Sequence, residues 1–448
     1  MRPATETPAR YKEIGDWKPA QPGDEFAKGR WWEVYSDPQL NSLEDQLSIS
    51  NQTLKAAQAR FLEARAGVRV SRAGLFPTAT AGLSISRARP SQNRALARPT
   101  SLTYNDFLLP VDVSYEPDVW GRVRRTVEAA RSEAQASAAD LASVELSLRA
   151  ELALDYFQLR GIDSQKHLLD STVTAYERTL ELAQSRYHGG LASAVDVAQA
   201  QTQLETTRAQ AADLEVQRAA FEHALAVLTG HAPYQFTVPP SPLAVPPPSI
   251  PPGLPSDLLE RRPDIAAAER RVEEANAQIG VARAAWFPLF TLSGAGGFES
   301  SKIGTLLQGP GGFWSLAGSA AELAFDGGKR RGLTQAARAA YDQSVDNYRQ
   351  TALTAFEEVE DNLAALRILE DVARMQGAAV AAAQHSLALS NTRYQGGVTS
   401  YLEVVTAQSA ALSDERAAVD ILTRRMIASV LLIKALGGGW NVSQIPPL

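Results

Sequence analysis

The spacing of apolar residues divides the chain into stretches of two kinds. In residues 38–74 apolar side chains recur every three or four positions, and residues 263–287 repeat the pattern, which predicts a helix in each place. Both stretches end in Phe-Pro, and proline disfavours a helical conformation in the residue before it. Apolar and polar residues then alternate, which predicts two strands in each half, near residues 75–90, 105–118, 287–300 and 312–326.

A long helical pattern follows each pair of strands. No proline occurs between Trp120 and Tyr187, and positions between Val345 and Ala373, Asn362 among them, step alternately by three and four, as in a coiled coil. Such a helix would span about 100 Å. A Gly-Gly pair ends each long helix, and a shorter return helix is predicted after it. The return helix is too short to cover the long helix. We therefore expect the helix before the strands to stack end to end with the return helix and to cover the rest of the long one.

The two halves are copies of one pattern. The segment Arg186-Tyr187-His188-Gly189-Gly190 recurs 207 positions later as Arg393-Tyr394-Gln395-Gly396-Gly397, and other matches follow in the same order. The chain is therefore a tandem duplication of residues 36–230 and 263–437. A Pro-rich connector, residues 231–262, joins the repeats and is expected to be extended and semi-rigid. Residues 1–35 are predicted to form a similar extended segment, and residues 438–448 a C-terminal tail.

Composition excludes several classes of function. Lys and Arg total 44 against 50 Asp and Glu, a net charge of -6, which argues against a nucleic-acid partner. The 448 residues include no Cys, which removes disulfides and thiolate metal sites, and they contain no apolar run long enough for a transmembrane helix. The five histidines have no metal-ligand spacing, and no set of polar residues suggests a catalytic centre. We therefore expect neither an enzyme nor a bound metal or cofactor.

The four strands raise a problem of closure. Each has about the ten residues that a tilted strand needs to cross a bilayer, but the smallest common barrel has about eight strands. An open sheet edge in lipid would leave backbone groups unpaired. A membrane barrel would therefore have to be shared between copies of the chain, and a dimer, a trimer or a tetramer would each serve. The alternative is a water-soluble four-stranded sheet at the end of a helical rod.

Six motifs, one of which occurs twice, resemble one known family. They are the segments at residues 31–40 (WWEVYSDPQL), 115–122 (YEPDVWGR), 261–265 (RRPDI) and 286–288 (WFP), the two Arg-Tyr-x-Gly-Gly turns, and residues 434–441 (KALGGGWN). The chain is similar over essentially its whole length to the outer membrane factors of tripartite efflux systems, the TolC family, in its NodT-type lipoprotein branch.

The resemblance implies an α+β membrane protein that acts as an outer-membrane exit channel. Members are homotrimers whose 12-stranded β-barrel, four strands per chain, lies in the outer membrane of a Gram-negative bacterium. A 12-helix α-barrel continues it into the periplasm. The implied partners are outer-membrane lipid, a periplasmic adaptor and an inner-membrane pump of the RND type, and the implied activity is passive export of small molecules. Members of this branch normally begin with a lipidated Cys, so we expect one upstream of Arg2.

Asp196 and Glu403 each follow a Gly-Gly turn by six residues. Acidic residues in the first turn of a helix stabilise the helix, and this is one interpretation of Asp196 and Glu403. The resemblance implies a second role, because it places them at the periplasmic end, where acidic rings constrict the closed pore. The sequence departs from the family pattern at Thr406, where many members have a second acid, and at Thr399, where some have a basic residue.

The turns themselves are the other candidate site. By resemblance, Tyr187, Gly189, Gly190, Tyr394, Gly396 and Gly397 form the tips that meet the adaptor, while glycine is also expected there for its positive φ. Gly327-Gly328-Lys329-Arg330 has a weak likeness to a phosphate loop, but it lacks the upstream glycine and the following Ser or Thr. We interpret it as a corner between a strand and a helix. A periplasmic coiled-coil adaptor is a further alternative, although such proteins do not usually place strand pairs within both halves.

Overall fold

The computed structural model describes residue 12 and residues 29–91, 103–243, 245–250 and 257–446. In the first half the elements are α1 (Pro38–Ser50), α2 (Gln52–Ala73), β1 (Thr78–Ala81), β2 (Ser84–Ala88), β3 (Tyr104–Tyr115), α3 (Arg122–His188) and α4 (Ala194–Leu228). In the second half they are α5 (Leu258–Arg261), α6 (Pro263–Ala284), β4 (Leu289–Ser300), β5 (Gly312–Ala321), α7 (Lys329–Gln395) and α8 (Tyr401–Ala435). Short 3-10 helices include η2 (Trp31–Tyr35), η3 (Pro233–Gln235), η5 (Ile303–Thr305), η6 (Gly309–Gly311) and η7 (Val442–Gln444).

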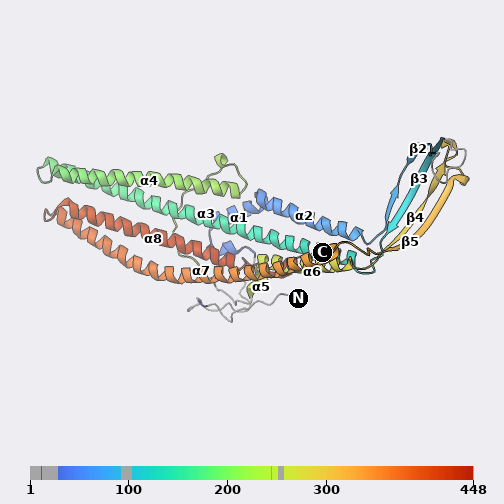
Figure 1. The fold of residues 1–448 in the computed structure, drawn as a ribbon. Helices are drawn as coiled ribbons and strands as arrows, with labels where there is room; N and C mark the ends of the chain where they lie inside the picture. Colours follow the sequence, from blue (N-terminus) through green and yellow to red (C-terminus); the bar gives the residue numbers. More distant parts are fainter. Residues whose placement is uncertain (1–11, 13–28, 92–102, 244, 251–256, 447–448) are drawn as a thin grey trace.

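The molecule is a long rod of helices with all of its strands at one end (Figure 1). The helical hairpins α3–α4 and α7–α8 both turn at the opposite end. α3 packs against α4 and α2 along one side and against α6 and α8 on another, and α7 packs against α8 and α6. Within the described residues, no helix has both the length and the apolar character needed to cross a membrane.

The sheet has the antiparallel order β1-β3-β4-β5, with β2 also paired to β3. The single strand expected near residues 75–90 is wrong in detail, since it is divided into β1 and β2. Both pieces keep one register, with Ala81 opposite Val111 and Ser84 opposite Leu108. Between them lies Pro110 of β3, which has no N–H to donate, so the ladder is interrupted there. The connection from β2 to β3 includes residues 92–102, which lie outside the described residues.

The strand expected near residues 312–326 ends earlier, at Ala321. The cause is the start of α7, because Asp326 accepts hydrogen bonds from the backbone N–H groups of Gly328 and Arg330. Asp118 does the same for Val123 and Arg124 at the start of α3. The Gly327–Arg330 segment is thus the strand-to-helix corner that the sequence indicated. Its backbone N–H groups already donate to the Asp326 carboxylate, whose charge would repel a phosphate.

The helix expected over residues 38–74 is broken at Asn51. Asn51 ends α1 and caps α2, because its Oδ1 accepts from the N–H of Leu54 at 2.9 Å, while its Nδ2 donates to the Leu228 carbonyl at the end of α4. Arg262 has the same position in the second half, where its guanidinium donates to the Ala435 carbonyl at the end of α8. α4 therefore meets the start of α2, and α8 meets the start of α6, which is the end-to-end stacking expected from the helix lengths.

One residue of the predicted heptad is wrong. Asn362 is only partly buried and donates to the Glu358 carbonyl, whereas its neighbour Leu363 is fully buried among the core positions of α7.

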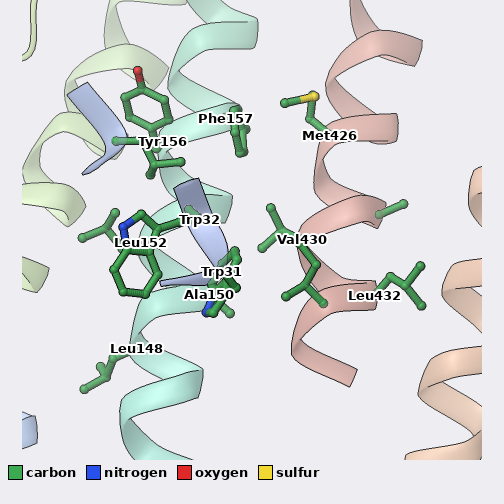
Figure 2. Close-up of a cluster of buried hydrophobic side chains, with 14 of the residues drawn as sticks. Trp31, Trp32, Leu148, Ala150, Leu152, Tyr156, Phe157, Met426, Val430 and Leu432 are labelled. Atoms are coloured by element: carbon green, nitrogen blue, oxygen red, sulfur yellow. The ribbon is translucent and has the colours of Figure 1, made fainter. Parts of the chain in front are cut away.

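The residues expected to be an extended N-terminal segment end in the helix η2, whose Trp31 and Trp32 are 3% and 2% exposed. Figure 2 shows these two rings beside Ala150 and Leu152 of α3, with Met426, Val430 and Leu432 of α8 opposite.

A carboxyl group lies next to this aromatic cluster without hydrogen bonds. Glu44 of α1 is fully buried, and neither carboxyl oxygen has a hydrogen-bond partner among the described residues. The nearest cation is Arg149, whose Nη1 is 3.5 Å from Glu44 Oε2 and whose guanidinium lies over the Trp32 ring at 4.2 Å. Burial outweighs this attraction and raises the pKa of Glu44 to about 8. Glu44 is therefore protonated at neutral pH.

Replacing Glu44 with Gln should stabilise the protein, and more so at high pH. The pKa of Glu44 is higher in the folded state than the ordinary value of 4.5, so its contribution to stability falls as pH rises from about 4.5 to about 8. Glu44→Gln should raise the free energy of unfolding by on the order of 3 kcal/mol at pH 8.5, and by little at pH 5. Helix melting followed by circular dichroism at both pH values measures this. The control is Glu63→Gln, which changes an exposed glutamate of α2, and an equal gain at both pH values would contradict the prediction.

Candidate functional site

The candidate site is the end of the rod where both helical hairpins turn, here called the hairpin tip, residues 186–196 and 393–403. The two turns come from the two repeats and lie at the same end of the molecule (Figure 1). A hydrogen bond joins them, because Arg186 Nη1 donates to the Gln395 carbonyl at 3.1 Å. The structure thus brings together all of the residues that the sequence singled out for the gate and for the tips.

Only the second glycine of each pair has the backbone conformation that favours glycine. Gly190 and Gly397 have φ of 69° and 74°, whereas Gly189 and Gly396 have φ of -81° and -73°. Each turn ends its helix in the same way, since the N–H of Leu191 donates to the Arg186 carbonyl at 2.8 Å and that of Val398 to the Arg393 carbonyl at 3.0 Å. The expectation of positive φ holds for Gly190 and Gly397 alone.

Asp196 and Glu403 are equivalent in sequence but differ in their contacts. Asp196 forms a capping box with Ser193: its Oδ2 accepts from the Ser193 N–H at 3.0 Å, and its own N–H donates to Ser193 Oγ at 3.3 Å. Ser400, the counterpart of Ser193, makes no such bond. Glu403 is exposed, on the same side of α8 as Leu402 and Thr406, and its carboxylate has no partner among the described residues. Asp196 is thus a helix cap, and Glu403 is free to act on its surroundings.

The two tyrosines of the turns also differ. Tyr394 is 4% exposed and packs with Tyr401, their ring centroids being 5.3 Å apart, in a small cluster with Ala183, Ala200 and Val404. Burial raises the pKa of Tyr394, and the nearby charge of Asp196 adds to this, so the hydroxyl stays neutral. Tyr187 is instead 45% exposed beside His188. The tyrosine of the second turn belongs to the packing of the tip, and that of the first belongs to its surface.

Arg186 is the residue of the tip whose role the sequence did not reveal. Its guanidinium lies over the Tyr394 ring at 4.8 Å in addition to bonding Gln395, so one side chain of α3 holds the end of α7. A signal was present in the sequence, because Arg precedes Tyr in both turns, but this match served only to identify the repeat. The duplicated residue Arg393 has no such contact among the described side chains.

Apolar side chains cover the outer surface of the tip. Leu191 and Val398, which directly follow the turns, are 74% and 71% exposed, and Val195 and Leu402, four residues later, are 61% and 57% exposed. Such residues in equivalent places of both hairpins form an exposed apolar surface, which in soluble regions often marks a contact with another protein. The described residues contain no group of three or more acidic or His side chains that could hold a metal ion.

The sheet at the other end has two chemically different faces. The pairing places Phe107, Val111, Val113, Phe290, Leu292, Trp314 and Leu316 on one face, here called the apolar face. The residues between them include Thr78, Thr80, Asp106, Asp112, Ser114, Ser293 and Ser315, which lie on the other face. Trp314 and Leu316 of the edge strand β5 are 78% and 79% exposed. Both faces of this sheet are thus open within one chain, and so are its two edges.

Comparison with known proteins identifies the family. The model of the outer membrane efflux protein family matches residues 43–231 and 254–438, one segment in each repeat. The toluene efflux pump outer membrane protein TtgF of Pseudomonas putida is 33% identical over 449 aligned positions, which cover 99% of this chain and 92% of the relative. The pyoverdine export outer membrane protein OpmQ of Pseudomonas aeruginosa is 32% identical, over 92% of this chain and 88% of the relative.

Solved structures agree with this result. The outer-membrane channel OprN superposes with a TM-score of 0.91 at 29% identity, over 98% of both chains. The CmeC outer membrane channel of Campylobacter jejuni superposes with a TM-score of 0.92 at 25% identity, over 99% of this chain and 95% of that one. The long helical hairpins and the strands at one end are therefore the fold of an outer-membrane channel. The chain belongs to the outer membrane efflux protein family and is the outer-membrane channel of an efflux system.

Proposed function

We propose that three copies of the chain form one channel, with a 12-stranded β-barrel in the outer membrane and a 12-helix α-barrel in the periplasm. The observation that carries this is the sheet, with its apolar face and its two unpaired edges at β5 and at β1 and β2. Pairing β5 of one copy with β1 and β2 of the next satisfies both edges and gives four strand positions per chain. The apolar face then meets lipid, and the polar face lines a passage for small molecules.

The oligomer tests this proposal. The purified protein should need detergent and should have a protein mass about three times the 48.2 kDa of one chain. Light scattering combined with absorbance and refractive index separates the protein mass from bound detergent. The reason is closure, since one sheet cannot satisfy its own edges. A detergent-free monomer, or a dimer in detergent, would contradict the trimeric barrel.

The hairpin tip is proposed to be the gate, with Glu403 as its charged element. If three copies of the exposed, unpaired carboxylate at the tip of the rod line a constriction, they would attract cations, because charges in a constriction act at short range. Asp196 contributes less to this field, because its carboxylate is held by Ser193. Arg186 joins the two hairpins within each copy.

Single neutralising substitutions should separate the two acids. Glu403→Gln should lower cation selectivity and weaken block by multivalent cations, with little change in stability. Asp196→Asn should cost about 0.5–1 kcal/mol of stability through its weakened cap and should change selectivity less. Planar-bilayer recordings and thermal melting measure the two effects. If Glu403→Gln leaves both selectivity and multivalent block at the level of the parent protein, the gate charge lies elsewhere.

We further propose that the tip contacts a periplasmic adaptor, which couples the channel to an inner-membrane pump of the RND type. Tyr187, Leu191 and Val398 present exposed apolar surface beside the glycines of the turns. Gly190 and Gly397 hold the residue after each turn in a fixed direction through the hydrogen bonds of Leu191 and Val398. A partner that buries these side chains would gain most of its affinity from apolar contact.

Polar replacements at the tip should weaken this contact. The double variant Leu191→Ser and Val398→Ser should bind its periplasmic adaptor about tenfold more weakly, because two apolar side chains would no longer be buried. Surface plasmon resonance on the detergent-solubilised channel measures the affinity. The matched control is Val216→Ser, at a residue of α4 that is 70% exposed and remote from the tip. Equal binding by the tip variant and the parent would place the adaptor contact elsewhere.

A further inference from the structure

A cavity of about 290 Å³ lies where the sheet meets the helices, at the opposite end from the hairpin tip. Its walls come from the loop between β3 and α3, from the segment between α6 and β4, and from the residues after β5. Neither the gate nor the adaptor contact uses it. One wall of the cavity is aromatic and its rim is charged, and side-chain contacts hold the residues of both in place.

The aromatic wall is rigid although it is half exposed. The Trp120 ring stacks on Phe287 with centroids 4.7 Å apart and an interplanar angle of 20°, and it is 6.4 Å from Phe290. Trp120 Nε1 donates to the Pro288 carbonyl at 2.8 Å, which fixes the indole. Trp120 and Phe287 are nevertheless 45% and 49% exposed. An immobile apolar surface of this kind suits a flexible apolar ligand, because only the ligand loses conformational entropy on binding.

The charged rim consists of one ion pair. Arg122 Nε and Nη2 donate to Glu116 Oε1 and Oε2 at 2.9 and 2.6 Å, and the side chains are 46% and 25% exposed. Asp118 also borders the cavity, but it already accepts from two backbone N–H groups and from Arg124. Because Asp118 is paired with Arg124, the rim offers one cation and one anion side by side, with no net charge.

The position of the cavity follows from the strand register. Phe290 is on the apolar face, because it is two residues from Leu292 in the same strand. The register agrees, since Phe290 pairs with Ala320 and Leu292 pairs with Gly318. The walls before β4 and after β3 belong to the two central strands of the sheet, and the third wall follows the edge strand β5. In the proposed barrel, on which this inference rests, the cavity opens toward the lipid at the periplasmic edge of the membrane.

We propose that this cavity binds one phospholipid with a zwitterionic headgroup that ends in a primary ammonium, that is, phosphatidylethanolamine. The phosphate would bind Arg122, the ammonium would bind Glu116, and an acyl chain would lie along Trp120 and Phe287. An anionic headgroup fits less well, because Glu116 neutralises Arg122, the cation of the rim. The second repeat lacks this site, since among the described side chains no ion pair joins Glu322 to Lys329 at the equivalent corner.

Native mass spectrometry of the detergent-solubilised protein tests the proposal, with phosphatidylethanolamine or phosphatidylglycerol added. The parent trimer should retain up to three molecules of phosphatidylethanolamine and should prefer it to phosphatidylglycerol about fivefold or more. Glu116→Gln leaves Arg122 unpaired and should reverse this preference in favour of the anionic lipid. Trp120→Ala should weaken binding of both lipids. Glu322→Gln, at the corner without an ion pair, should match the parent.

The same spectra separate two failures. A trimer that binds both lipids equally, or whose preference is unchanged by Glu116→Gln, overturns the lipid site and leaves the channel proposal intact. A protein that is not a trimer overturns the proposed assembly itself. If Glu116→Gln does not assemble, Arg122→Lys provides a second variant: it keeps the charge but loses the bidentate geometry, and it should lower phosphatidylethanolamine binding about fivefold in the intact trimer. Unchanged binding by that variant would also overturn the site.

Discussion

The two helices of 67 residues, α3 and α7, need packing partners along their whole length, and no other helix of the described chain is long enough. α4 and α8 have 35 residues each, and α2 and α6 have 22 each. The partner of each long helix is therefore assembled from two pieces that meet end to end. Most of the stability of long helices comes from such packing and not from helix propensity, so the rod depends on these two junctions.

The junctions explain the features that cluster around them. Each joins the C-terminus of one helix to the N-terminus of another, where carbonyl and N–H groups lack partners within the helix. Asn51 and Arg262 supply the missing hydrogen bonds. Glycine is needed at Gly230 and Gly437, because both have positive φ and a Cβ there would lie 2.5 and 2.0 Å from the carbonyl oxygens of Ser50 and Arg261. The tryptophans of η2 pack beside the second junction, where Trp31 contacts Gly438.

The sequence predicted the order and type of the elements well, because helical and strand periodicity are local properties and the duplication supplied each pattern twice. The prediction from sequence failed where a residue distant in the chain determines the local structure. The break in the first strand depends on Pro110, which is opposite in the sheet but distant in the chain, and the choice of Leu363 over Asn362 depends on which side of α7 meets its neighbours. The two acids of the tip hold equivalent positions in the sequence, and only the structure distinguishes them, since Asp196 forms a capping box with Ser193 and Glu403 forms none with Ser400.

The two ends of the molecule are stabilised in different ways, and this bears on how a channel can be both firm and able to open. The helical hairpins satisfy their backbone hydrogen bonds within one chain, so they can shift against one another without breaking them. The sheet leaves its edges unpaired until other copies join it, so closure of the barrel fixes the assembly at the membrane end. At the tip, the hairpins of a chain are joined by Arg186, which lies over one tyrosine ring and makes one hydrogen bond, and by the small cluster of Tyr394 and Tyr401 with Ala183 and Ala200. Contacts of this kind are weak enough to be exchanged for contacts with a partner, which makes the tip the end where movement costs least.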